Sequence, residues 1–138
     1  MPVSTGIISR EVLQDSSSRD ELSYALADIL NGIRREWSLT LVELSNLLGR
    51  PHGTVKGWLK KGGYVGLDSA LDPNTQAIID FIDIYNMTAS FFVRTADQSE
   101  WFKTPSAKFD GKSPMAMISE NPHNMMIARQ IISRMLNP

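Results

Sequence analysis

Apolar residues recur every three or four positions along most of this chain, which is the period of amphipathic helices. The first apolar face spans residues 19–36, and the Ser-Arg-Asp-Glu run at 18–21 is interpreted as a capping box at its start. No segment suggests a β-sheet, and no repeat or low-complexity run is present. We therefore predict an all-α fold.

The same pattern predicts further helices, separated by Gly, Pro, Ser and Asn signals. They cover residues 40–48, 53–60, 75–93, 97–102 and 114–119, and a final helix opens at Asn121-Pro122. Between the first two, Gly49-Arg50-Pro51 supplies a left-handed cap and then a proline that cannot continue a helix interior. The 75–93 helix is apolar on more than one side. We expect it to face the core on one side and a dimer mate on the other.

Composition narrows the class of protein. The 138 residues carry a net charge of −1 and 42% apolar side chains, which is ordinary for a globular domain. No apolar stretch approaches the roughly 20 residues needed to cross a bilayer, and the N-terminus does not resemble a signal peptide. The absence of cysteine excludes disulfides and thiolate metal sites. We expect a cytoplasmic protein without a membrane partner.

Charge is unevenly distributed along the chain. Residues 34–61 carry six basic and two acidic side chains, a local net charge of +4, whereas the segments on either side are acidic. A basic patch on a neutral or acidic body is expected when a single module contacts phosphate.

Residues 39–61 have the spacing of a helix-turn-helix. Ser45 is small where the second helix passes close, Gly49 stands at the turn, and Val55 and Trp58 anchor the second helix in the core. Such a motif presents the N-terminal side chains of its second helix to base edges, with phosphate contacts near the helix end. The predicted base-facing residues are His52, Thr54 and Lys56, with Arg50 near the turn as a further DNA-binding residue. The predicted phosphate contacts are Lys60 and Lys61.

This segment resembles the Xre-type helix-turn-helix of bacterial and phage repressors. It departs at Ser45, where that family usually has alanine, and at Gly53 and Gly57 within the recognition helix. Each glycine costs about 1 kcal/mol of helix propensity relative to alanine, and Gly57 removes a side chain that could reach DNA. The alternative is a helical hairpin with no role in DNA binding.

A second motif follows at residues 101–118. Trp101, then Thr104-Pro105, then Gly111-Lys112-Ser113-Pro114 and an apolar helix resemble the C-terminal toxin-binding domain of Xre/MbcA/ParS antitoxins. The resemblance implies a type II antitoxin that occludes a cognate toxin, typically a RES-domain enzyme that consumes NAD⁺. The predicted segments are an N-terminal arm (1–18), a helix-turn-helix domain (19–68), a connecting and dimerisation helix (69–95) and a toxin-binding domain (96–138).

The motif residues themselves have structural interpretations. Trp101 is expected to be a large apolar plug, whose indole N–H needs a partner if it is buried. Gly111 is expected to take a positive φ, and Ser113 and Pro114 to cap and begin a helix. Contact with the toxin is expected instead from the less apolar side of the last helix and the tail, while Met115 and Met135 are expected in the core. The predicted toxin-binding residues are Met126, Arg129, Gln130, Arg134, Asn137 and Pro138.

We do not expect an enzyme or a cofactor. His52 and His123 lie far apart with no second ligand at metal-binding spacing, and Asp80 and Asp83 are interpreted as a solvated helix edge. The favoured hypothesis is an antitoxin that also represses its own operon as a DNA-bound homodimer. Two alternatives remain open: a solitary transcription regulator, and a protein-only inhibitor whose helix-turn-helix has decayed.

Overall fold

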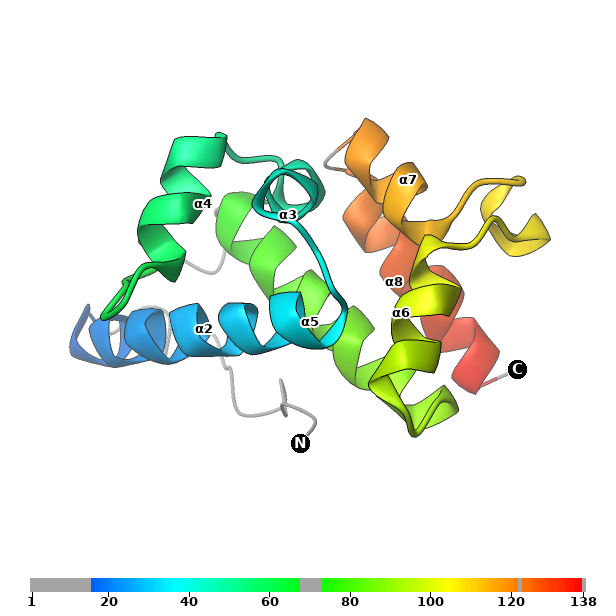
Figure 1. Cartoon of the computed structure of the whole chain (residues 1–138), viewed down its shortest axis with the longest axis horizontal. Helices are drawn as coiled ribbons and strands as arrows, with labels where there is room; N and C mark the ends of the chain where they lie inside the picture. Colours follow the sequence, from blue (N-terminus) through cyan, green and yellow to red (C-terminus); the bar gives the residue numbers. More distant parts are fainter. Residues whose placement is uncertain (1–15, 68–72, 122, 138) are drawn as a thin grey trace.

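The structure, a computed structural model, describes residues 16–67, 73–121 and 123–137 (Figure 1). These residues form helices joined by short connections, and their one β feature is an isolated bridge between Ser106 and Lys112. The prediction of an all-α fold is therefore confirmed. Almost all of the predicted N-terminal arm, residues 1–15, lies outside the described residues, and so do residues 68–72, which fall between the predicted helices at 53–60 and 75–93.

Most helices begin and end within three residues of the predicted boundaries. They are α2 (Ser16–Glu36), α3 (Leu41–Leu48), α4 (His52–Leu59), α5 (Pro73–Phe91), α6 (Thr95–Lys103), the 3₁₀ helix η2 (Ala107–Phe109), α7 (Pro114–Glu120) and α8 (Asn124–Leu136). The capping box predicted at residues 18–21 is wrong, because α2 already includes Ser18. The predicted break after α2 is confirmed, since Ser38 takes a positive φ of 51°.

Helix α5 runs through the middle of the molecule (Figure 1). It packs against α3, α6 and α8, while α3 also contacts α4 on one side and α7 on the other. Ile78, Phe81, Ile82, Ile84 and Tyr85 of α5 are all buried by these helices of the same chain. The apolar breadth of α5 is thus explained by intrachain packing and no longer argues for a dimer mate on this helix.

One hydrophobic cluster extends from Leu26 of α2 to Ile132 of α8. It draws on all three predicted segments after the arm, so the core does not divide at residues 68 or 95. Trp37 is completely buried in it, with ring centroids 4.6 Å from Phe102, 5.3 Å from Tyr85 and 6.2 Å from Phe81. Trp37 falls between the predicted helices at 19–36 and 40–48, and the sequence pattern did not predict its place in the core.

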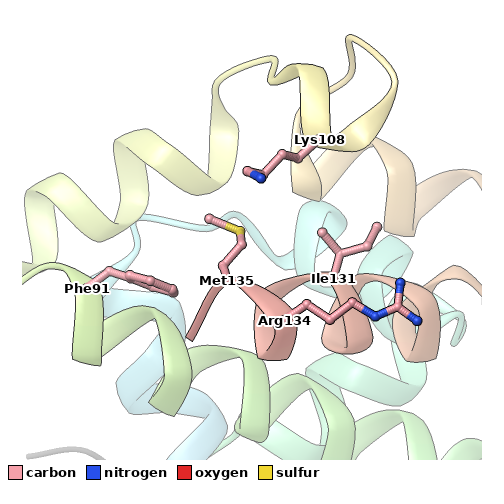
Figure 2. A pocket seen from close by; sticks show the side chains of 5 residues that line it. All are labelled: Phe91, Lys108, Ile131, Arg134 and Met135. Carbon is pink, nitrogen blue, oxygen red and sulfur yellow. The ribbon is translucent and has the colours of Figure 1, made fainter. Parts of the chain in front are cut away.

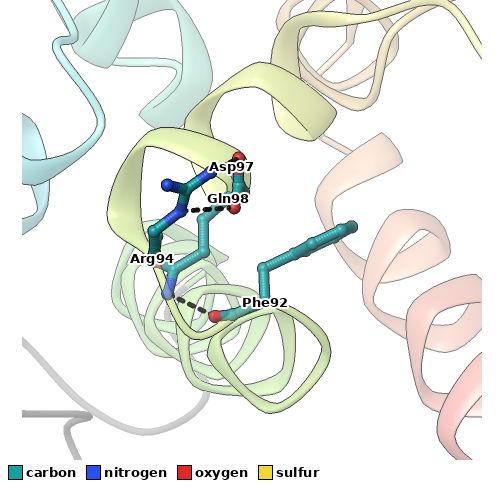
Figure 3. A network of polar contacts seen from close by, with 4 residues as sticks. All are labelled: Phe92, Arg94, Asp97 and Gln98. Atoms are coloured by element: carbon teal, nitrogen blue, oxygen red, sulfur yellow. Dashed lines mark hydrogen bonds and ion pairs between the residues drawn. The ribbon is translucent and has the colours of Figure 1, made fainter.

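Trp37 also ties the end of α2 to α6 through hydrogen bonds. Its indole Nε1 donates to Oε1 of Gln98 at 3.0 Å, and Oγ of Ser99 donates to its backbone carbonyl at 2.7 Å. The amide nitrogen of Gln98 donates in turn to the carbonyl of Phe92 at 2.8 Å, beside the Arg94–Asp97 ion pair (Figure 3). Every polar atom that Trp37 brings into the core at this point therefore has a partner.

Candidate nucleic-acid and partner interfaces

Local hydrogen bonds fix the turn between α3 and α4. Thr40 caps α3: its hydroxyl accepts from the N–H of Glu43 at 3.0 Å, and the Glu43 carboxylate accepts from the N–H of Thr40 at 2.8 Å. Gly49 ends α3 with the predicted left-handed conformation, at φ 64°, and Pro51 precedes α4. Figure 1 looks nearly along α3 while α4 lies across the view. The two helices thus cross steeply, as a helix-turn-helix requires.

Helix α4 is held by one face. Val55 and Trp58 are buried in the core, and Nδ2 of Asn31 donates to the carbonyl of Leu59 at 3.0 Å, which ties the end of α4 to α2. Because these residues fix the inner side, His52 and Lys56 lie on the outer side, where both are exposed. This outer side is the surface that would have to enter a groove of DNA.

The six predicted DNA contacts do not share one environment. His52, Lys56, Lys60 and Lys61 are exposed, whereas Thr54 and Arg50 are half-buried. The guanidinium of Arg50 lies 5.8 Å from the ring centroid of Trp58, a cation–π arrangement. Arg50 therefore helps to hold the turn on α4, and the four exposed residues are the better placed for DNA.

The two glycines of α4 are not required by the fold. A Cβ added at Gly53 or Gly57 would meet no other atom within 4 Å beyond its own helix and chain neighbours, and neither residue has a positive φ. Helix α4 therefore has a lower helix propensity at both positions than alanine would give, and no neighbouring atom of the chain excludes a side chain there.

The predicted toxin-binding residues of α8 also lie in different environments. Met126, Gln130, Arg134 and Asn137 are exposed, and Pro138 lies outside the described residues. Arg129 instead reaches across to α5, where its Nε is 2.9 Å from Oδ2 of Asp83 and 3.7 Å from Oδ1 of Asp80. Its guanidinium is therefore engaged within the chain, joining α8 to α5.

The interpretation of Asp80 and Asp83 as a solvated edge is wrong. Asp80 is only 5% exposed, because α8 covers this side of α5, and it accepts a hydrogen bond from Nε2 of Gln76 at 3.0 Å. Burial raises the pKa of Asp80 above its ordinary value, although Gln76 and the charge of Arg129 act in the opposite direction. The two carboxylates are part of the α5–α8 contact.

The residues of the second motif shape the loop between α6 and α7. As predicted, Gly111 has a positive φ of 79°, Ser113 accepts from the N–H of Ala116 at 3.0 Å, and Pro114 begins α7. Trp101, however, is only half-buried, with ring centroids 6.2 Å from Phe92 and 6.1 Å from Phe109. Trp101 therefore packs against the edge of the core, whereas Trp37 lies completely inside it.

A cavity of about 440 Å³ opens where α5, η2 and α8 meet (Figure 2). Phe91, Ile131 and Met135 supply apolar surface, and Lys108 and Arg134 supply two cations. Met135 and Met115 are half-buried, so they border the core and do not fill it as expected. Sequence reasoning singled out Arg134 but missed Phe91 and Lys108 as site residues, because only the fold brings these three elements together.

A second cavity of about 380 Å³ lies on α6. Phe92 and Trp101 line it together with Asp97, Glu100 and Thr104, so it combines aromatic rings with carboxylates. Phe91 and Phe92 are consecutive, which places the cationic and the acidic cavity next to each other at the α5–α6 junction.

Among the described residues, no three His, Cys, Asp or Glu side chains gather in a way that could hold a metal ion. No described helix is long and apolar enough to span a membrane. No protein-family model matches the sequence, and no curated protein matches it significantly.

Proposed function

We propose that this protein is a DNA-binding antitoxin, which recognises an operator through α4 and occludes a cognate toxin through α8. The observation that carries the DNA half is the outer side of α4. It is exposed, it follows a three-residue turn held by backbone hydrogen bonds, and it carries Lys56 and His52 with Lys60 and Lys61 at its end. Cations at these places suit phosphate contacts that orient the first turn toward base edges.

The toxin half of the proposal rests on the resemblance of residues 101–118 to antitoxin domains of the Xre/MbcA/ParS type. The structural roles of Gly111, Ser113 and Pro114 are compatible with a motif that positions α7 and α8. On α8, Met126 is 54% exposed and Gln130 is exposed, so this face remains available for a protein. A RES-domain toxin would be silenced by occlusion alone, without chemistry or a cofactor from this chain.

A mobility shift with the protein's own promoter tests the DNA half. Lys56→Ala is expected to weaken binding more than Arg129→Ala, because Lys56 lies on α4 and Arg129 on the α5–α8 contact. Lys112→Ala is the matched control, since it also removes one exposed lysine, which pairs with Glu120 of α7 and belongs neither to α4 nor to the α5–α8 contact. Binding should also weaken steeply with salt. The reverse order of Lys56→Ala and Arg129→Ala would place the DNA face elsewhere.

Co-expression with the product of the adjacent gene tests the toxin half. A stable complex and rescue of growth are expected, and Met126→Glu should weaken both by placing a charge on the exposed face of α8. Promoter binding without any complex would leave a solitary regulator. A complex without promoter binding would favour a protein-only inhibitor, for which the unexplained glycines Gly53 and Gly57 are the specific observation.

A further inference from the structure

Large apolar side chains are exposed at the junction of α5 and α6. Val93 is 96% exposed and Phe91 is 36% exposed, with the half-buried Phe92 between them. We call Phe91, Phe92 and Val93 the junction strip. Three consecutive large apolar residues that remain this open mark a surface suited to association.

The two sides of the junction strip carry opposite charge. On the Phe91 side, the first cavity is lined by Lys108, which lies above Ile131 and Met135 in Figure 2, and by Arg134, which lies below them. On the Phe92 side, the second cavity holds Asp97 and Glu100 beside Trp101.

Three of these four charges are available for an intermolecular pair. Asp97 is already paired with Arg94 at 3.0 Å. Lys108 and Glu100 are both exposed, and within the described residues neither side chain forms an ion pair. The surface thus offers two cations, Lys108 and Arg134, on one side of an apolar strip and one carboxylate, Glu100, on the other, and none of the three forms an ion pair within the described residues.

We propose that the junction strip is the interface of a homodimer, in which Lys108 of one protomer pairs with Glu100 of the partner subunit. A two-fold axis that lies in the interface along the strip brings the cationic side of each protomer onto the acidic side of the other. Such an interface is isologous, so every contact occurs twice. The apolar residues of the strip then cover one another at its centre.

A second copy fits this surface better than an unrelated protein because the complementarity lies within one chain. Helix α5 was the sequence-based candidate for dimerisation, but its apolar side chains are buried against α3, α6 and α8 of the same chain. The strip sits at the end of that same helix. The inference does not depend on DNA or toxin binding, because it uses Lys108, Glu100 and Val93, which the proposed function does not assign to either partner.

Sedimentation equilibrium of the full chain over a concentration series, at low and high salt, is the test. Wild type should show a monomer–dimer equilibrium that weakens with salt. Lys108→Glu and Glu100→Lys should each raise the dimer dissociation constant at least about tenfold, because each places like charges together twice. The double variant carrying both substitutions should regain most of the lost affinity. Val93→Asp should also weaken the dimer, and it should leave the monomer folded because Val93 is almost fully exposed.

Lys60→Glu and Asp28→Lys are the matched controls, since both reverse exposed charges on other helix ends or faces. Circular dichroism checks that all variants fold. A monomeric wild type would overturn the proposal, and so would single reversals that leave the dissociation constant unchanged. A double variant weaker than either single one would also overturn it, because it would place the two charges outside a common contact. In any of these cases the strip is covered by another partner or stays open.

Discussion

The hydrogen bond between Trp37 and Gln98 allows a quantitative test of how the end of α2 is joined to α6. Trp37→Phe keeps an aromatic ring but removes the indole N–H, which leaves Oε1 of Gln98 without that donor in a site only 3% exposed. An unsatisfied buried acceptor costs about 1–3 kcal/mol, and the smaller ring leaves space worth roughly 1 kcal/mol more. We therefore expect Trp37→Phe to lower the free energy of unfolding by about 2–4 kcal/mol.

A double-mutant cycle isolates the bond itself. Gln98→Met removes the acceptor and also the amide that donates to the carbonyl of Phe92. The Phe92 loss is common to the single and double variants, so it cancels in the coupling energy. With both Trp37 and Gln98 replaced, neither partner is left unsatisfied, and the double variant should be more stable than the sum of the single losses predicts by about 1 kcal/mol or more.

Urea unfolding followed by far-ultraviolet circular dichroism is the suitable assay, because removal of Trp37 changes the fluorescence signal itself. The slope against urea should stay constant, since the surface exposed on unfolding is almost the same. Because α2 and α6 share one hydrophobic cluster, one cooperative transition is expected for every variant. Losses that add within about 0.5 kcal/mol would refute the coupling. Two separate transitions would refute the single core.

Three further predictions concern local features. Gly53→Ala and Gly57→Ala should each raise the free energy of unfolding by about 0.4–1 kcal/mol in thermal or urea unfolding, since both sites are open, and a loss at either would reveal a contact that the fold does not explain. The pKa of folded Asp80 lies above the 3.8 of the ordinary carboxyl, so the folded state binds more protons, and stability should fall as pH rises from 3.8 through that pKa. Asp80→Asn should abolish this loss of stability with rising pH when the free energy of unfolding is measured over a pH series. An unchanged pH profile would mean that another group causes the loss. Ser113→Ala should cost about 1 kcal/mol by removing the cap of α7, whereas a cost near zero would mean that Pro114 alone starts the helix.

Structural features that depend on close neighbours in the sequence were predicted correctly. Each helix shows the apolar period of its buried face, and the left-handed Gly49, the positive φ of Gly111 and the cap at Ser113 depend only on nearby backbone. The error at Ser18 has the same local origin. Serine near a helix start is typical of a cap, but several serines in a row leave the first residue of the helix undetermined.

Features that depend on distant residues were missed. Trp37 falls between two predicted helices and belongs to no apolar period, yet aromatic rings 44 to 65 positions away in the sequence pack against it. Asp80 and Arg129 are separated by a loop, a 3₁₀ helix and two α-helices, so their pairing leaves no periodic signal. The cavity with Phe91 and Lys108 likewise exists only after α5, η2 and α8 have packed.

The packing also constrains how proposed toxin and operator binding would influence each other. A toxin can change operator affinity only if it favours one arrangement of the protein over another. Helix α3 contacts both α4 and α7, but these contacts belong to one continuous core, which the structure shows in a single arrangement. The proposed dimer offers the simpler route, because a toxin that alters the spacing of two α4 helices alters how well both fit an operator. Under this view Glu100→Lys removes most of the effect of toxin on operator affinity. An undiminished effect in that variant would instead show coupling within a single chain.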